Sequence, residues 1–140
     1  MRKASYIASI VIGALMIVGG ISTWFVVSTT LSDQKIVVSG DASCLAGDTV
    51  DGPFSAYCQA KVIEKHALDA TGGKTYSELD REDPLRAVAQ NATFLQASLF
   101  TSVVAFGVAG MAILIGILFV LIGFGMRDVD ERSQKPAPTT

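Results

Sequence analysis

Residues 83–126 read DPLRAVAQNATFLQASLFTSVVAFGVAGMAILIGILFVLIGFGM, and this run establishes the fold class of the 140-residue chain. No charged residue occurs after Arg86 until Arg127. Because about 20 consecutive apolar residues suffice to cross the hydrocarbon core of a bilayer, the uncharged run is longer than one span needs. The sequence therefore predicts a membrane-spanning helix with additional turns outside the bilayer.

The predicted helix covers residues 84–126. Asp83 is a favourable N-cap residue, and Pro84 suits the first helical position. Polar side chains recur as far as Gln96. We therefore expect the outer part of the helix to be exposed to water and residues 99–126 to form the transmembrane span.

Small residues recur along this helix at alternating spacings of four and three. Membrane helices associate where small side chains let two backbones approach, and a period of about 3.5 residues keeps such a seam against its partner. The alternative is that glycine and alanine are simply common in membrane helices. The predicted helix-packing positions are Ser98, Ser102, Ala105, Ala109, Ala112, Gly116 and Gly123, with the larger Phe119 in the same series.

A second uncharged run, Ala4–Ser32, predicts an N-terminal transmembrane helix over residues 1–31. The run is too long for the apolar core of a secretory signal peptide, which is the alternative explanation of such a segment. Tyr6 and Trp24 are placed to anchor its two ends at the membrane interfaces. Small residues near one face predict packing against the other span as an antiparallel hairpin; they are Ser5, Ser9, Gly13 and Gly20.

The charges beside the spans predict the direction of insertion. Arg2 and Lys3 precede the first span, and positive charge favours the cytoplasmic side. With two spans, the C-terminus is cytoplasmic as well, and we expect the tail over 127–140 to be disordered. We predict a bacterial plasma-membrane protein embedded in the lipid bilayer, with the loop over 32–98 on the extracytoplasmic side.

The predicted extracytoplasmic cap, residues 32–83, contains the only two cysteines, Cys44 and Cys58. In an exported loop two such cysteines can form a disulfide, whereas in the cytosol they would stay reduced. Two unrelated thiols are the alternative. The predicted Cys44–Cys58 disulfide is therefore tied to the predicted topology.

The local pattern of the cap predicts a mixture of strands and helices. Short strands are expected over Lys35–Ser39 and Asp48–Phe54, and a helix over Ser55–Ala70 that ends at Gly72–Gly73. A capping box beginning at Thr75 predicts a further short helix. The predicted fold is a mainly α membrane protein, a two-span antiparallel transmembrane helical hairpin with a small extracytoplasmic α+β cap.

The residues that carry chemistry in other proteins are scarce in this chain. His66 is the only histidine, and we expect it to be a surface residue with a local hydrogen bond, near Glu64 or Asp69, rather than a catalytic residue or metal ligand. Neither predicted span contains a titratable residue of the kind that proton relays and ion pathways use. We therefore predict no catalytic residue, no metal site and no cofactor.

The charge distribution bears on possible partners. The net charge is −2 and the middle segment is acidic, so we predict no nucleic-acid partner. Carboxylates gather before the second span, where they could form a docking face for a basic partner. Arg81 and Arg86 lie among them, so the alternative is a solvated, salt-bridged helix junction. The possible docking face consists of Asp80, Glu82 and Asp83.

Several segments resemble a family of small two-pass actinobacterial membrane proteins that often carry the automatic label "aromatic ring-opening dioxygenase" and have no established function. The similar segments are HAL and TGGKTYSELDREDPLR within 66–86, NATFL at 91–95, ASLFTSVVAFG at 97–107 and VDGPF at 50–54. The resemblance implies two spans. The label implies ring cleavage at an iron held by two histidines and a carboxylate, and this chain has one histidine. We therefore predict that the protein is not an enzyme.

Three functions remain as hypotheses. The favoured one is a non-enzymatic membrane protein that acts as an accessory or interaction subunit of a larger respiratory or cell-envelope complex, or that forms a homo-oligomer. The first alternative is an extracytoplasmic sensing or ligand-binding module with Tyr57, His66 and Tyr76 around a small pocket. The second alternative is the dioxygenase-related protein that the family label names.

Overall fold

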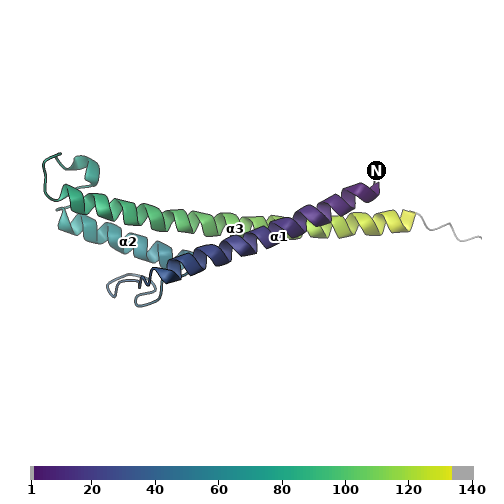
Figure 1. Cartoon of the computed structure of the whole chain (residues 1–140), viewed down its shortest axis with the longest axis horizontal. Coiled ribbons are helices and arrows are strands. Elements are labelled where there is room, and N and C mark those ends of the chain that lie inside the picture. The colour runs from purple at the N-terminus through teal and green to yellow at the C-terminus, as the bar shows by residue number, and fades with distance from the viewer. Residues whose placement is uncertain (1, 134–140) are drawn as a thin grey trace, which may run out of the picture. The chain divides into compact units, whose positions relative to one another are not determined.

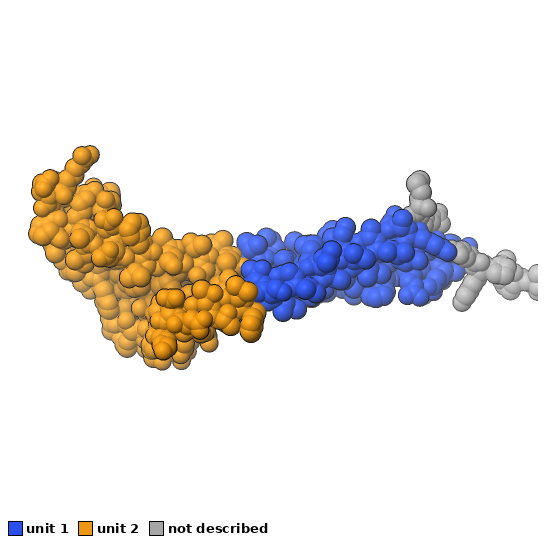
Figure 2. All heavy atoms as spheres, viewed as in Figure 1, with its two compact units in different colours: residues 1–24, 108–140 blue, residues 25–107 orange. Residues whose placement is uncertain are grey.

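The computed structural model describes residues 2–133 and consists mainly of helices (Figure 1). In chain order they are α1 (Arg2–Asp33), α2 (Pro53–Ala70), the 3-10 helix η1 (Tyr76–Glu78) and α3 (Arg86–Ser133). The chain divides into two compact units, coloured separately in Figure 2. Unit 1 comprises Met1–Trp24 and Val108–Thr140, and unit 2 comprises Phe25–Gly107.

Both α1 and α3 are long and apolar enough to cross a membrane. In their most apolar windows only 11% of α1 and 17% of α3 are buried inside the protein. A core helix of a soluble domain is buried over most of its length, whereas the outward apolar faces of these helices are uncovered. The coarse prediction, two long apolar helices packed against each other, is confirmed.

The predicted α+β cap is wrong. Within residues 2–133 the structure has no strand, and the two segments predicted as strands meet only in an isolated antiparallel bridge, Val37 to Thr49. Backbone hydrogen bonds of 2.9 Å join Val38 to Asp48 and Val50 to Ile36 around it. At one end the pairing stops because Lys35 turns the chain with a φ of +54° and α2 starts at Pro53. At the other end Leu45 and Gly47 adopt φ values of +51° and +85°, which are turn conformations.

The two ends of α3 differ from the predicted ends for local reasons. Regular α-helix begins at Arg86, two residues after the predicted start at Pro84. Asp83 lies in the turn before it, and its carboxylate accepts a 2.8 Å hydrogen bond from the backbone N–H of Leu85. At the other end, α3 continues through Ser133, so the part of the predicted disordered tail that is described is helical. The pairs Arg127–Glu131 and Arg132–Asp128 support these extra turns at i,i+4 spacing. Residues 134–140 of the predicted tail lie outside the described part.

Helix α2 begins two residues earlier than predicted and ends where the sequence indicated. Gly72 and Gly73 adopt φ values of +64° and +85°, and the N–H of Gly73 donates to the carbonyl of Leu68 at 2.7 Å. This is a Schellman-type helix end. The short helix expected after Thr75 is the single turn η1, in which the Glu78 carboxylate accepts hydrogen bonds from both the N–H and the hydroxyl of Thr75, each at 2.8 Å.

Unit 2 has a small hydrophobic core to which α1, α2, α3 and the loop before α2 all contribute. The buried members of this core are Leu31, Val38, Val50, Ala56, Cys58, Ala60, Leu99 and Phe106. Val38 and Val50 are 1% and 0% exposed, although the bridge between their neighbours is only one residue pair long. The bridge therefore serves to turn two valine side chains inward.

Candidate functional site

The contact between α1 and α3 in unit 1 is built on glycine. A Cβ atom placed on Gly13 would lie 2.5 Å from the carbonyl oxygen of Gly116, and one placed on Gly116 would lie 2.7 Å from the carbonyl oxygen of Gly13. Real Cβ atoms do not approach a backbone oxygen so closely. The two backbones can therefore touch here only because both positions lack a side chain.

The same contact repeats in both directions along the pair. A Cβ on Gly20 would lie 2.7 Å from the carbonyl oxygen of Ala109, and a Cβ on Gly123 would lie 3.1 Å from that of Tyr6. Each step of seven residues up α1 is matched by a step of seven residues down α3. The helices are antiparallel with a heptad register, the geometry of a left-handed pair.

Ser9 adds a polar contact to this seam. Its side chain is 8% exposed and its hydroxyl donates a 2.7 Å hydrogen bond to the backbone carbonyl of Phe119 across the pair. The energy of such bonds between membrane helices is modest, about 0.6 kcal/mol on average, but it fixes which residues face each other. Other hydroxyls of the long helices, such as those of Ser22 and Thr30, bond to carbonyls of their own helix.

The structure uses only one of the two predicted columns of α3. Ala109, Gly116 and Gly123 face α1 in unit 1, whereas Ala112 is half-buried in the next column. The second column of the seam is displaced by one residue and contains larger side chains: Ile113 packs on Gly20 and Val120 on Gly13. Large residues that recur every seven positions are the signal that could have indicated this column: Leu99, Phe106, Ile113 and Val120.

The predicted seam positions in unit 2 line an open groove instead of a closed contact. Ser98, Ser102 and Ala105 form one wall, and Val27 and Leu31 of α1 belong to the opposite side. The groove has a volume of about 540 Å³. Its lining is aliphatic with hydroxyl groups and contains no charged residue; the other members are Val26, Thr30, Gln34, Ile36, Ile63, Leu95, Leu99 and Thr101.

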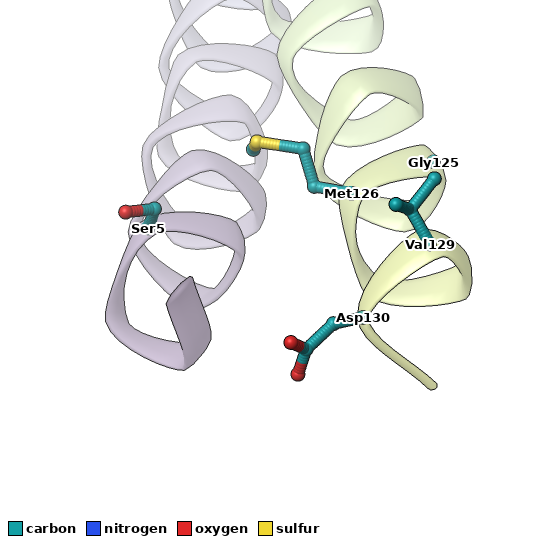
Figure 3. Close-up of a pocket in the computed structure, with 5 residues that line it drawn as sticks. All are labelled: Ser5, Gly125, Met126, Val129 and Asp130. Carbon is teal, nitrogen blue, oxygen red and sulfur yellow. The ribbon is translucent and has the colours of Figure 1, made fainter. Parts of the chain in front are cut away.

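A second hollow, of about 490 Å³, lies in unit 1 where α1 begins. It is lined by Ser5, Gly125, Met126, Val129 and Asp130 (Figure 3). Figure 3 shows the Met126 side chain extending toward α1 and the Asp130 carboxylate directed into the space between the helix ends. Its walls are apolar apart from Ser5 and this carboxylate.

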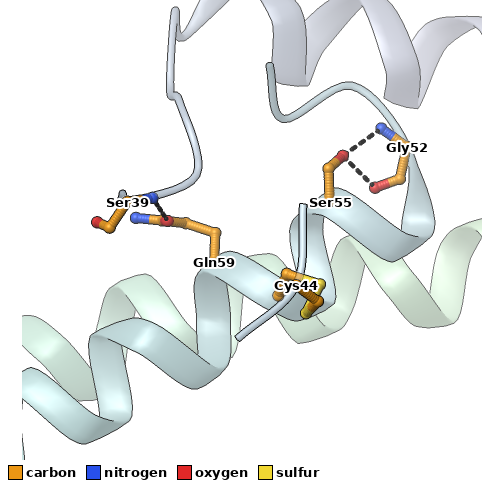
Figure 4. Close-up of a disulfide and its surroundings, with 6 residues drawn as sticks. Ser39, Cys44, Gly52, Ser55 and Gln59 are labelled. Carbon is orange, nitrogen blue, oxygen red and sulfur yellow. Dashed lines mark hydrogen bonds between the residues drawn. A yellow bond between two sulfur atoms is a disulfide. The ribbon is translucent and has the colours of Figure 1, made fainter. Parts of the chain in front are cut away.

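The loop before α2 is fastened to that helix by the Cys44–Cys58 disulfide, with a Cα–Cα distance of 5.8 Å. The prediction of this bridge is confirmed. Two hydrogen-bonded contacts lie beside it (Figure 4): the Gln59 side chain accepts from the N–H of Ser39 at 3.0 Å, and the hydroxyl of Ser55 bonds to Gly52. Gln59 and Ser55 are both buried, and the loop that they hold supplies hydrogen-bond partners to the Gln59 side-chain oxygen and to the Ser55 hydroxyl.

His66 contacts a residue that the sequence did not indicate. Its Nε2 donates to the carboxylate of Asp41 at 2.7 Å, whereas Glu64 pairs with Lys61 at 2.5 Å. Lys65 approaches the same Asp41 carboxylate at 3.7 Å. The hydrogen bond from His66 holds the pKa of Asp41 below its usual value. Asp41 lies 25 residues before His66, and no periodic signal connects two such positions.

The three side chains predicted around a ligand pocket have separate contacts. The ring of Tyr57 lies 6.0 Å from that of Phe100 in an edge-to-face arrangement, and Tyr76 lies under the guanidinium of Arg86 at 4.1 Å. His66 borders a hollow of about 340 Å³ against α3, and Tyr76 borders a different one of about 100 Å³. The structure does not bring the three together around one cavity.

The possible docking face is split by its own local structure. Asp80 and Glu82 are exposed, whereas Asp83 is half-buried and occupied with Leu85. The guanidinium of Arg86 covers Tyr76 and donates to the carbonyl of Leu79, and within the described residues 2–133 it forms no ion pair with these carboxylates. Among residues 2–133, no cluster of three or more potential metal ligands occurs.

Comparison with known proteins returns nothing: no family model, no curated protein and no solved structure matches this chain. The geometry of the chain itself is therefore the basis for any functional conclusion.

Proposed function

We propose that the chain is a non-enzymatic integral membrane protein that acts as an accessory or interaction subunit of a larger membrane complex. One observation carries the proposal: α1 and α3 use their glycine seam on each other and still leave their remaining apolar faces uncovered. Leu15, Val18, Leu114 and Leu121 are each more than 60% exposed. Lipid or a neighbouring membrane protein must cover such surfaces, because contact of so much apolar surface with water is unfavourable.

The proposal places the protein in a bacterial plasma membrane with both termini in the cytoplasm and α2 outside. The disulfide supports this arrangement, because such bonds persist in extracytoplasmic and not in cytosolic surroundings. We further propose that the chain belongs to the family of two-pass membrane proteins that it resembles. The partner would be a respiratory or cell-envelope complex, and the alternative to such a partner is self-association.

A role without catalysis is supported by the surroundings of the one histidine. His66 is half-exposed and bonded to the Asp41 carboxylate, which Lys65 also approaches. In the hollow that His66 borders, the other lining residues are aliphatic except for Asn91, so the lining supplies no second acid, base or nucleophile. Within the described part of the chain, the one carboxylate within hydrogen-bond reach of His66 is that of Asp41, and no serine, cysteine or lysine nucleophile lines this hollow beside the histidine, as nucleophilic catalysis would need.

Affinity purification tests the proposal. The full chain with a C-terminal tag is extracted from native membranes in a mild detergent and analysed by mass spectrometry and size-exclusion chromatography with light scattering. We expect a stoichiometric membrane-protein partner or a homo-oligomer. Recovery of the monomer alone under gentle extraction would contradict the proposal, and an unrelated two-span protein with the same tag serves as control.

A second candidate function, a ligand-binding module, is favoured by the groove in unit 2. Its volume of about 540 Å³ and its apolar lining with a few hydroxyls are typical of small-molecule sites. Native mass spectrometry of the purified chain should then reveal a bound small molecule that Ser102→Trp removes. An unliganded mass in both samples would eliminate this candidate.

A further inference from the structure

The first two turns of α2 differ in character from the rest of that helix. Residues 53–60 contain no charged side chain, whereas every charged residue of α2 lies at or beyond Lys61. Phe54 and Tyr57 are 78% and 47% exposed. The N-terminal end of α2 thus presents two aromatic rings outward where a water-exposed helix would present polar groups.

The ring of Tyr57 lies beside the start of the apolar part of α3, and Phe54 precedes it by one turn of α2. The edge-to-face contact with Phe100 joins Tyr57 to α3 one residue after Leu99, where the predicted span begins. Further along α2, Ala67 shares a hollow with Val88 and Leu95, which precede that span. The uncharged end of α2 is therefore near the level at which α3 would enter the membrane, and its charged end lies further out.

We propose that the exposed aromatic face of α2, formed by Phe54 and Tyr57, inserts into the outer lipid–water interface and is a third membrane contact of this protein. The inference rests on the proposed membrane insertion of α1 and α3 and adds a lipid contact to it. The occupant is lipid because Tyr57 contacts Phe100 where the apolar part of α3 begins, and because the exposed residues of α2 change along the helix from aromatic to charged. Aromatic rings favour the headgroup region, where an apolar body and a polar surrounding are both available.

Two neighbouring residues limit the depth of this contact. Lys61 follows Phe54 and Tyr57 on the same face at i+7 and i+4, and its long side chain can keep the ammonium among the headgroups while its stem lies on apolar surface. Asp51 precedes α2 and is exposed, and a carboxylate does not enter hydrocarbon. The rings therefore lie in the interface and upper acyl region and do not span the core.

A single-tryptophan experiment on the full chain tests the inference, because Trp24 is the only native tryptophan. The test protein carries Trp24→Phe and Phe54→Trp and is reconstituted in zwitterionic bilayers. Bromines high on the acyl chains quench an interfacial indole, and aqueous iodide quenches an exposed one. The matched control carries Trp24→Phe and Phe94→Trp, because Phe94 is 63% exposed on the part of α3 before the predicted span.

We expect the indole introduced by Phe54→Trp to lose most of its emission to brominated lipid and little to iodide, and the control to show the reverse. Quenching by iodide as strong as in the control would overturn the inference. So would shielding from both quenchers, which would indicate a protein partner or a second copy. Trp24 of the wild type tests membrane insertion separately from the α2 contact. If brominated lipid quenches Trp24, α1 is inserted and the Phe54→Trp result decides the α2 contact alone. If brominated lipid does not quench Trp24, both the proposed insertion and the α2 contact are refuted.

Discussion

Gly13 and Gly116 touch backbone to backbone, and this contact depends on two missing methyl groups. Within a bilayer there is no hydrophobic drive to bring helices together, so the van der Waals contact of two bare backbones supplies much of the attraction. Gly19, Gly107 and Gly125 have no atom within 4 Å of a potential Cβ. Glycines of the same helices therefore differ in their contribution to helix packing, and this difference depends on which of them face the other helix.

Replacing one seam glycine should loosen the helix pair. We expect Gly13→Leu to destabilise the packing of α1 on α3 by about 1–3 kcal/mol, the usual penalty of overpacking a close contact, because its side chain would collide with the Gly116 carbonyl and Val120. Thermal unfolding of the full chain in detergent, followed by circular dichroism, measures the change. Gly19→Leu is the matched control in the same helix, and equal effects of both variants would contradict the seam.

Asp41 and His66 form the other residue-level feature with a measurable consequence. The hydrogen bond from His66 lowers the pKa of Asp41, so the carboxylate is favoured in the folded state. A group with a lowered folded pKa stabilises the fold above its unfolded pKa, which is about 3.9 for aspartate, and this contribution disappears as the pH falls through the folded value.

We expect the Asp41 carboxyl carbon, observed by NMR in the full chain, to titrate below the usual aspartate value. His66→Ala should raise that midpoint toward the ordinary value, because the principal hydrogen-bond donor is removed. Lys65→Ala is the control, since the contribution of Lys65 to this pKa is the smallest of those acting on the group. Identical midpoints in the wild type and His66→Ala would show that the pair does not form.

At the scale of elements, α2 is held by covalent and polar attachments more than by a large core. The disulfide, the Gln59 contact to Ser39 and the inward valines fasten the preceding loop to it. A small lobe with few buried residues has little hydrophobic free energy to offset chain entropy, so a cross-link matters more here than in a large domain.

Removing the disulfide should therefore loosen the loop without disturbing the helix pair. A bridge across this sequence separation of 14 contributes about 3 kcal/mol by loop-closure entropy. The double variant Cys44→Ala/Cys58→Ala should show faster hydrogen exchange at the amides of Val38 and Val50, and unchanged exchange in the seam around Gly13 and Gly116. Reduction of the wild type should reproduce the result, and uniform protection in both proteins would refute it.

The elements also show where sequence periodicity was sufficient and where it was not. Among the small residues that recur along α3, Ala109, Gly116 and Gly123 lie against α1, because a close backbone contact admits only small side chains. In the adjacent column the large residues Ile113 and Val120 flank glycines of α1, and the spacing of small residues does not indicate them.

The strands predicted for the cap were wrong for a different reason. Val37 and Thr49 do pair, as the β-branched composition of their segments suggested, but the pairing stops after one bridge. Local propensity could not anticipate the turn at Lys35 or the early start of α2.

At the scale of the whole molecule, two features bear on the side of the membrane on which α2 lies. The positive charge before α1 and the disulfide both favour an extracytoplasmic α2. The two long apolar helices on either side of α2 then return the C-terminus to the side of the N-terminus.

Accessibility labelling in intact cells measures this topology. In the background Cys44→Ala/Cys58→Ala, we expect a membrane-impermeant maleimide to label Glu82→Cys in intact cells and Ser133→Cys only after the cells are opened. Glu82 and Ser133 are both exposed, so access and not burial decides the result. Labelling of Ser133→Cys alone in intact cells would reverse the orientation.

Composition, capping patterns and residue chemistry along the chain were enough to predict the two long apolar helices, their packing against each other, the disulfide partners and the C-terminal end of α2, because each of these depends on a few neighbouring positions or on a residue type. The register of the helix pair, the partner of His66, the groove beside Ser102 and the loss of the predicted strands emerged only from the folded arrangement. Those features depend on which atoms of distant segments come within contact distance, and no periodicity along one segment encodes the neighbour that it meets.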